Sequence, residues 1–227
     1  GEKIKILIAA HCFSDSPHSY GYNIFDDFYD WIETLGIISE KTDYDWYVKT
    51  HPDYIESSKL TLINLIKKYP KIKMLPSNAS HNQLIKEGIN YVLTCYGTIA
   101  HEYAARNITV INASINNPHI AYNFNLNPRS KSQYTKILLN LPNIKFKINT
   151  KKVYEFYYMR YLQNANNWLI EDYKSLQNLI GYKEFSKPII YKYLLPSFKK
   201  ERIKKINKNI KNFIESREYF LQPKHIN

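Results

Sequence analysis

The sequence predicts a doubly wound α/β domain with a parallel sheet, followed by a helical C-terminal extension. Three observations lead to this prediction. Short apolar runs alternate with segments of helical periodicity over residues 1–147. Residues 91–114 contain an apolar strand, a small-residue turn, a helix and a second apolar strand in direct succession, which is a βαβ unit. From residue 148 onward, no apolar run has to belong to the sheet.

The strands are expected from their apolar runs and the helices from their periodicity. Residues 3–10 (KIKILIAA) form an apolar run bounded by polar residues, which is typical of a parallel strand covered on both faces. The other expected strands are 44–48, 72–75, 91–95 and 109–113. The helical patterns between and after them cover 25–35, 60–66, 82–88, 98–107 and 134–141.

The C-terminal extension, 148–227, is predicted to be helical and to pack on the first domain. Residues 199–220 are expected to form a long helix, in which Ile203, Ile206 and Ile210 recur at helical spacing beside a run of lysines. This pattern is typical of an amphipathic helix with a solvated basic face. It also fits attraction to an anionic membrane surface or to an acidic acceptor.

The formal net charge of +12 raises the question of a nucleic-acid partner. Most of the basic residues are lysines dispersed among many Asn and Ile residues, so no nucleic acid is expected. There is no apolar run of about 18 residues and no signal-peptide pattern. Cys12 and Cys95 flank or end expected buried strands, where we interpret them as small apolar residues in a reducing cytosol.

Polar side chains gather where three of the expected strands end. They are His11, Ser14 and Asp15 after the first strand, Lys49 and His51 after the second, and Gly97, Thr98 and Glu102 after the fourth. Ligands bind at the carboxyl edge of open α/β sheets, so these clusters are expected to converge there. Cationic side chains and backbone N–H groups at a helix start suit a phosphate, and a carboxylate on that helix suits a ribose.

Each of these residues also has a structural interpretation. His51 precedes Pro52 and can hydrogen-bond its own turn, and Glu102 can be an exposed helix residue. His11 and Asp15 can order the loop after the first strand instead of taking part in catalysis.

Two more histidines and several absent motifs complete the sequence prediction. His119 can line a base pocket or cap a loop, and His101 is expected on the surface of its helix. The cysteines lack zinc spacing, and no G-x-G-x-x-G, P-loop or G-x-S-x-G motif is present. These absences leave a nucleotide pocket with no metal expected.

The order and spacing of the motifs resemble the nucleotide-sugar-binding half of GT-B glycosyltransferases, especially those of bacterial capsule and lipopolysaccharide assembly. The resemblance covers residues 3–142. It is carried by K-T-H-P at 49–52, by Y-G-T at 96–98 with the helical Glu102, by N-P-H at 117–119, and by the opening ILIAAHCFSDSPHSYG.

The resemblance implies a Rossmann-like donor domain. In it, His51 and Lys49 would contact the donor phosphate, Gly97 and Thr98 would form a helix-end phosphate site, and Glu102 would hold the ribose. These groups would stabilise the departing nucleotide phosphate without a metal or another cofactor.

The function expected from the resemblance is enzymatic. A sugar would pass from a nucleotide-sugar to a surface polysaccharide or a lipid-linked acceptor, in the cytoplasm and at the membrane surface near the basic helix. His11 and Asp15 are the candidates for contacting the sugar or acting as base, and His119 for the base pocket. GT-B enzymes have two such domains, so an N-terminal acceptor domain is expected to lie outside this chain.

Two alternatives remain open at this stage. One is a CDP-glycerol or CDP-ribitol polyol-phosphate transferase, which would use the same H-P and helix-end arrangement. The other is a non-enzymatic basic module that binds nucleic acid or a membrane.

Overall fold

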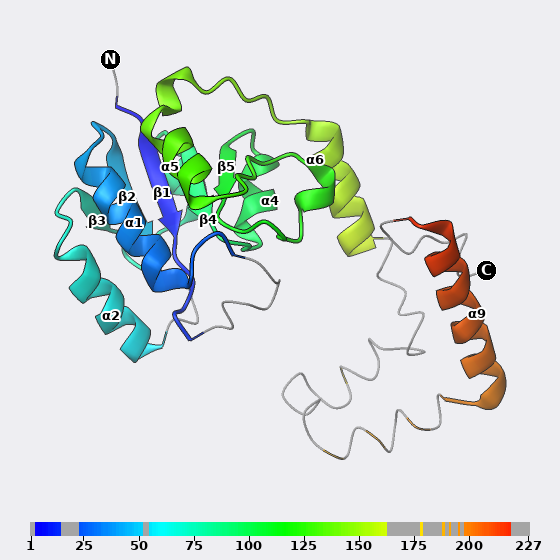
Figure 1. The fold of residues 1–227 in the computed structure, drawn as a ribbon. Helices are drawn as coiled ribbons and strands as arrows, with labels where there is room; N and C mark the ends of the chain where they lie inside the picture. The colour runs from blue at the N-terminus through cyan, green and yellow to red at the C-terminus, as the bar shows by residue number, and fades with distance from the viewer. Residues whose placement is uncertain are drawn as a thin grey trace. The chain divides into compact units, whose positions relative to one another are not determined.

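The computed structural model describes residues 3–14, 23–51, 55–162 and 198–218, together with the single positions 178, 188, 191 and 195 (Figure 1). The chain divides into two compact units, 1–156 and 157–227. The first unit extends past the predicted boundary at residue 147, because Val153 and Phe156 of helix α6 (Thr150–Tyr157) are buried.

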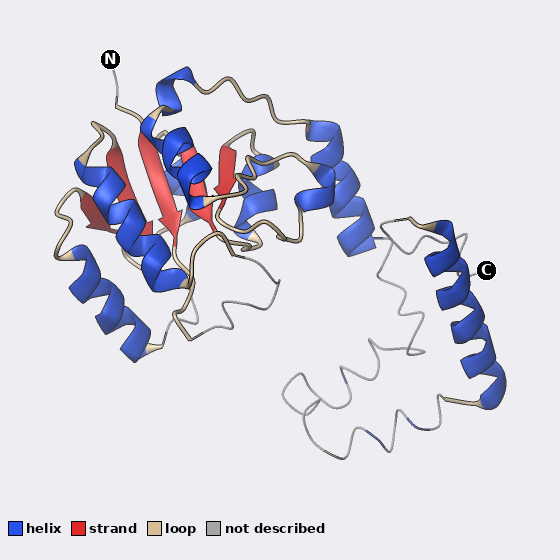
Figure 2. Cartoon of the chain, viewed as in Figure 1, coloured by secondary structure: helices blue, strands red, loops and turns tan. Residues whose placement is uncertain are grey.

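A parallel sheet of five strands forms the centre of the first unit, and its strands all point the same way in Figure 2. The spatial order is β3-β2-β1-β4-β5. The chain therefore adds strands on one side of β1, then crosses over and continues with β4 on the other side. This confirms the predicted doubly wound, Rossmann-like sheet. The strands are β1 (Lys5–Ala9), β2 (Asp45–Lys49), β3 (Ile72–Met74), β4 (Tyr91–Thr94) and β5 (Thr109–Asn112).

Helices cover both faces of the sheet, as Figure 1 shows with α1 and α5 in front of it and α4 behind. Alternate residues of a strand point to opposite faces. Ile6 and Ile8 of β1 pack with α1, α2 and α5, whereas Leu7 packs with α3 and α4. The helices are α1 (Phe28–Glu40), α2 (Glu56–Ile66), α3 (His81–Lys86), α4 (Ile99–Ala104) and α5 (Lys131–Leu139).

Short helical turns complete the first unit. The 3₁₀ turns are η1 (Ile120–Tyr122) and η2 (Leu141–Asn143). Asn107 follows α4 with a φ of 61°, so the predicted C-terminal stop of this helix adopts the left-handed conformation that Asn tolerates.

Helix α1 approaches its neighbours closely at two points. A Cβ atom added to Gly36 would lie 2.2 Å from Cδ2 of Tyr69, so glycine is what lets this ring lie against the helix. On the same helix, the buried Trp31 donates its Nε1–H to the hydroxyl of Tyr134 in α5, over 3.0 Å.

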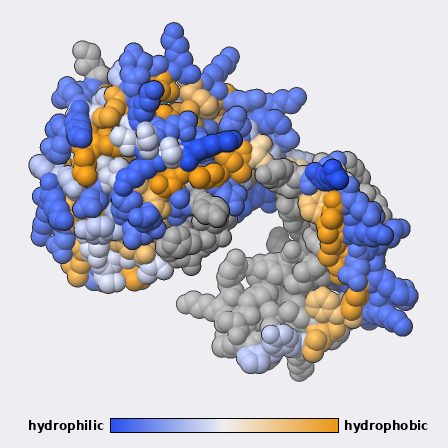
Figure 3. Space-filling view, viewed as in Figure 1, coloured by the Kyte–Doolittle hydropathy of each residue, from blue (hydrophilic) through white to orange (hydrophobic). Residues whose placement is uncertain are grey.

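In the second unit, the π-helical turn η3 (Tyr158–Leu162) follows α6, and α9 (Lys200–Ser216) is the long helix predicted near the C-terminus. Ile206 is buried, while Ile203, Ile210 and Ile214 are exposed and form the apolar stripe visible on α9 in Figure 3. The predicted end of this helix at Phe220 lies outside the described residues. No helix in the described part of the chain combines the length and the apolar character needed to cross a membrane.

Candidate functional site

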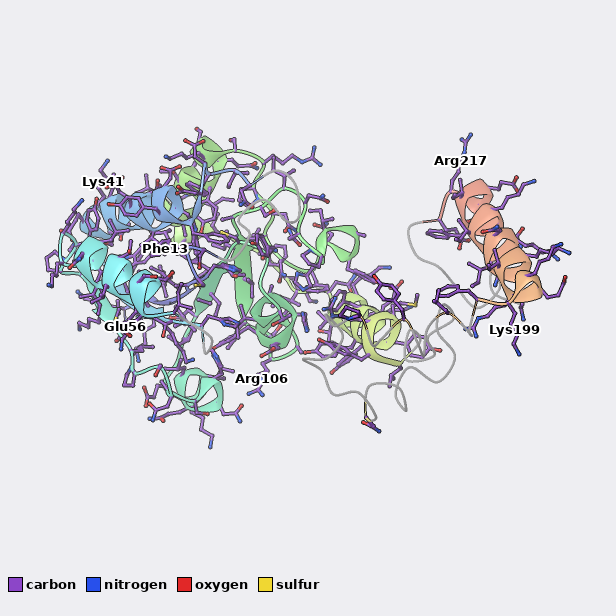
Figure 4. All side chains as sticks on the ribbon, turned by 90° about the horizontal axis from the view of Figure 1, so that it is seen from below. Phe13, Lys41, Glu56, Arg106, Lys199 and Arg217 are labelled. Carbon is purple, nitrogen blue, oxygen red and sulfur yellow. The ribbon has the colours of Figure 1, made fainter. Side chains whose placement is uncertain are left out.

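A cavity of about 560 Å³ opens at the carboxyl ends of β1, β2 and β4. The chain order of the sheet reverses between β1 and β4, and such switch points are where open α/β sheets bind ligands. Figure 4 shows the side chains of the unit from below the view of Figure 1, with Phe13 after β1, Glu56 at the start of α2 and Arg106 after α4 as landmarks. The cavity is lined by Ala9, Ala10, His11, Cys12, Lys49, Thr50, His51, His81, Thr94, Tyr96, Gly97, Thr98, Ile99 and Glu102.

Most of the residues that the sequence singled out meet in this one cavity. Of the residues predicted from the sequence, those that line it are His11, Lys49, His51, Gly97, Thr98 and Glu102. They come from three segments separated in sequence, and the parallel pairing of β1 with both β2 and β4 brings these segments to one edge. Asp15 lies outside the described residues, and His119 does not line the cavity.

Lys49 is the last residue of β2, and only 6% of its surface is exposed. Among the residues that the structure describes, none accepts a hydrogen bond from its ammonium group or forms an ion pair with it. An anion bound in the cavity would give this ammonium group a partner of opposite charge. The cavity is therefore suited electrostatically to an anionic ligand.

His11 joins β1 to the end of β4 through hydrogen bonds. Its Nε2 lies 2.9 Å from Thr94 Oγ1 and accepts from the backbone N–H of Cys95 at 3.3 Å. The ring also stacks on Phe28, with centroids 4.8 Å apart. Burial, and secondarily the neighbouring His51, lower the pKa of His11 to about 4. His11 is therefore neutral at pH 7, with its proton on Nδ1.

The turn before α4 is where the sequence predicts a backbone phosphate site, and the structure shows which of its N–H groups are already engaged. The N–H of Gly97 donates to Thr94 Oγ1 at 3.2 Å and is therefore already occupied. In the described chain, the N–H groups of Thr98 and Ile99 have no acceptor. Because α4 has only six residues, its dipole is small, and any contribution to anion binding comes from these two N–H groups.

Glu102 lies on α4, is exposed, and contributes a carboxylate to the cavity wall. Cys12, which the sequence suggested was a small apolar residue, is buried and also lines the cavity. Its Sγ lies 3.3 Å from Ser14 Oγ and 3.2 Å from Ser58 Oγ. Burial raises the pKa of the Cys12 thiol, but hydrogen bonds with the side chains of Ser14 and Ser58 and with the backbone of Ile55 and Ser14 together outweigh this effect and leave the pKa below its usual value.

His81 is a cavity residue that the sequence reasoning missed. It is the first residue of α3, the helix that follows β3, so it belongs to the same edge of the sheet. The sequence prediction used polar residues after the first, second and fourth strands only. The rule that ligands bind at the carboxyl ends of parallel strands applies equally to the third. The Nδ1 atom of His81 lies 2.9 Å from the hydroxyl of Tyr103.

The histidines His101 and His119 form a buried pair away from the cavity lining. His101 Nδ1 lies 2.9 Å from His119 Nε2, and the two residues are 1% and 2% exposed. Both rings pack against Phe156 of α6. The expectation that His101 is a surface residue is therefore wrong, because α6 covers this side of α4. The N–H of His119 donates to Asn117 Oδ1, so this segment is a capped loop and not a wall of the pocket.

No protein-family model matches this chain, and no curated protein matches it significantly. Nor do the described residues contain a group of three His, Cys, Asp or Glu side chains placed to hold a metal ion. The chemistry of the cavity is therefore the basis for a functional proposal.

Proposed function

We propose that the first unit binds the nucleoside diphosphate of a nucleotide-sugar, and that the chain is the donor-binding part of a GT-B type glycosyltransferase. The acceptor would be a surface polysaccharide or a lipid-linked glycan. The observation that carries the proposal is Lys49, a residue only 6% exposed that lines a cavity at the switch point of the sheet and whose ammonium group lacks an acceptor in the described residues.

The proposed ligand pose follows from the donors around the cavity. The two phosphates lie between Lys49 and His51 on one side and the N–H groups of Thr98 and Ile99 on the other. The carboxylate of Glu102 accepts hydrogen bonds from the ribose hydroxyls. The cavity volume of about 560 Å³ is within the range of small-molecule sites.

In the proposed reaction, an acceptor hydroxyl oxygen forms a bond to the anomeric carbon and gives up its proton to a base, while the bond between that carbon and the diphosphate oxygen breaks and leaves its electron pair on the diphosphate. Fixed cationic groups and N–H donors stabilise charge that develops on a departing group. Lys49 and His51 would supply that stabilisation, so we propose that transfer does not require a metal ion. The basic helix α9 would provide attraction to the anionic membrane surface at which lipid-linked acceptors lie.

A calorimetric titration of the full chain with CMP, CDP, UDP and GDP tests the proposal. We expect one nucleoside diphosphate to bind, and both Lys49→Met and His51→Ala to weaken that binding at least tenfold. Binding is expected to persist in EDTA. The proposal is overturned if none of the four nucleotides binds, or if both variants bind like the wild type.

Product analysis then identifies the reaction. Incubation with the nucleotide-sugar of the selected base should release the nucleoside diphosphate. Release of CMP from CDP-glycerol or CDP-ribitol, with the polyol phosphate carried into the product, would instead identify a polyol-phosphate transferase.

A further inference from the structure

His81 and Tyr103 lie side by side at the cavity and are joined by a hydrogen bond. The distance from His81 Nδ1 to the Tyr103 hydroxyl is 2.9 Å, and the two rings meet edge to face with centroids 5.6 Å apart. Tyr103 belongs to α4 and is 1% exposed, whereas His81 belongs to α3 and lines the cavity. A buried residue thus holds the ring of a cavity residue.

The burial of Tyr103 decides which way the proton points. Burial raises the pKa of Tyr103, so its hydroxyl keeps its proton. Among the described residues, His81 Nδ1 is the partner of this hydroxyl. If Nδ1 carried a hydrogen and donated it, the hydroxyl hydrogen would be buried without an acceptor, which is costly. Tyr103 therefore donates to Nδ1, and the proton of the neutral imidazole sits on Nε2.

The charges around His81 also favour the neutral imidazole. Burial lowers the pKa of His81, and the positive charges of Lys49 on β2 and Arg106 after α4 lower it further. His81 Nε2 has no hydrogen-bond partner in the described residues. An anion bound beside Lys49 would offset the repulsion from that charge. Nε2 carries a hydrogen in the neutral tautomer and in the imidazolium, so it donates in either case.

We infer that His81 is a further ligand-contacting residue of the cavity, which donates its Nε2–H to a phosphate oxygen, and that Tyr103 is the positioning residue that selects this tautomer. This inference rests on the proposed function, because it needs a phosphate in the cavity. It adds a donor from α3 to those of β2 and of the turn before α4, so that three segments surround the diphosphate.

The tautomer is measured directly by ¹⁵N NMR of the full chain. We expect His81 at pH 7.5 to show a protonated Nε2 and an unprotonated Nδ1. In Tyr103→Phe the donor to Nδ1 is gone, and the two tautomers should become mixed. A protonated Nδ1 in the wild type would overturn the role of Tyr103.

Binding is tested with inorganic pyrophosphate and with the nucleoside diphosphate selected by the titration above. His81→Gln places an amide N–H near the position of Nε2, whereas His81→Asn places its amide near Nδ1 and leaves the Nε2 position empty. We expect His81→Asn to weaken binding of both ligands roughly 10- to 100-fold, as for a lost hydrogen bond to a charged group. His81→Gln should remain within about threefold of the wild type.

The controls separate the inference from the function on which it rests. Gln83→Ala, on the exposed side of the same helix, should leave binding unchanged, and thermal unfolding confirms that each variant is folded. If Lys49→Met loses binding while His81→Asn keeps it, the role of His81 is wrong and the proposed function stands. If wild type binds neither ligand, both are overturned.

Discussion

The Nε2 atom of His11 lies 2.9 Å from the Thr94 hydroxyl, so the segment after β1 is tied to the last residue of β4. The same hydroxyl oxygen accepts the N–H of Gly97 at 3.2 Å. A hydroxyl has one hydrogen to donate, and here that hydrogen goes to His11. One buried threonine thus orders both the loop after β1 and the turn before α4, which are two walls of the cavity.

Replacing Thr94 by Val should destabilise the protein. The change keeps the side-chain shape but leaves the N–H of Gly97 without its acceptor, which costs roughly 1 to 3 kcal/mol of unfolding free energy. Urea unfolding followed by tryptophan fluorescence measures the loss. Thr109→Val, at the start of β5, is the matched control and should change stability by less than about 0.5 kcal/mol. Equal stability of the two variants would contradict the role of Thr94.

The stability of the protein should depend on pH through His11. Its pKa is about 4 in the fold against 6.5 for an ordinary histidine, so the unfolded chain binds the proton more readily. The stabilisation is therefore complete above pH 6.5 and is lost as the pH falls toward 4. The loss amounts to about 3 kcal/mol at most.

Urea unfolding of wild type and His11→Gln at pH 4.5 and 7.5 isolates this effect. The pKa of His81 is also lowered, which contributes in the same direction. The pH dependence should therefore be smaller in His11→Gln but not absent. An identical pH dependence in the two proteins would show that His11 is not the titrating group.

Lys49→Met should raise stability while it weakens ligand binding. The methionine removes the charge of a largely buried side chain that has no acceptor among the described residues, which we expect to add roughly 1 kcal/mol to the unfolding free energy. Thermal unfolding without ligand measures the gain, and the nucleotide titration measures the loss. Lys73→Met, an exposed lysine on the neighbouring β3, is the control and should change neither quantity. A destabilised Lys49→Met would mean that the ammonium has a structural role.

Gly36→Ala should destabilise the protein, although the same change in a helix interior ordinarily stabilises it by roughly 0.5 to 1 kcal/mol. The new methyl group would overlap the ring of Tyr69, whose displacement should cost about 1 to 3 kcal/mol. Urea unfolding of Gly36→Ala in the wild-type and Tyr69→Ala backgrounds tests the cause. The loss of unfolding free energy should disappear in the Tyr69→Ala background. A loss that persists there would show that overlap with the Tyr69 ring is not its cause.

Much of the first unit could be predicted because local patterns report burial. The apolar run at 3–10 and the periodicity at 25–35 each predict an element without knowledge of its neighbours, and the structure has β1 at Lys5–Ala9 and α1 at Phe28–Glu40. Cavity residues were found for the same reason: parallel strands end at one edge, so polar residues after strand ends can be expected to meet.

His81, His101 and His119 show where that reasoning fails. His101 is buried because α6, which comes some fifty residues later in the chain, lies against it through Phe156. His81 lines the cavity after the end of β3, but the contact with Tyr103 that orients its ring comes from another helix and is seen only in the tertiary structure. No local pattern encodes which distant segment will cover a side chain.

The sequence by itself determined the α/β class, the approximate positions of the five strands and of the helices between them, and the presence of cationic groups at strand ends. Only the tertiary structure decided that β4 pairs with β1, which places the switch point and the cavity between them. It also decided that Lys49 is buried without an acceptor in the described residues and that His119 lies away from the cavity lining. The physical reason is that periodicity records whether a residue is buried, whereas its partners are set by long-range packing of the chain.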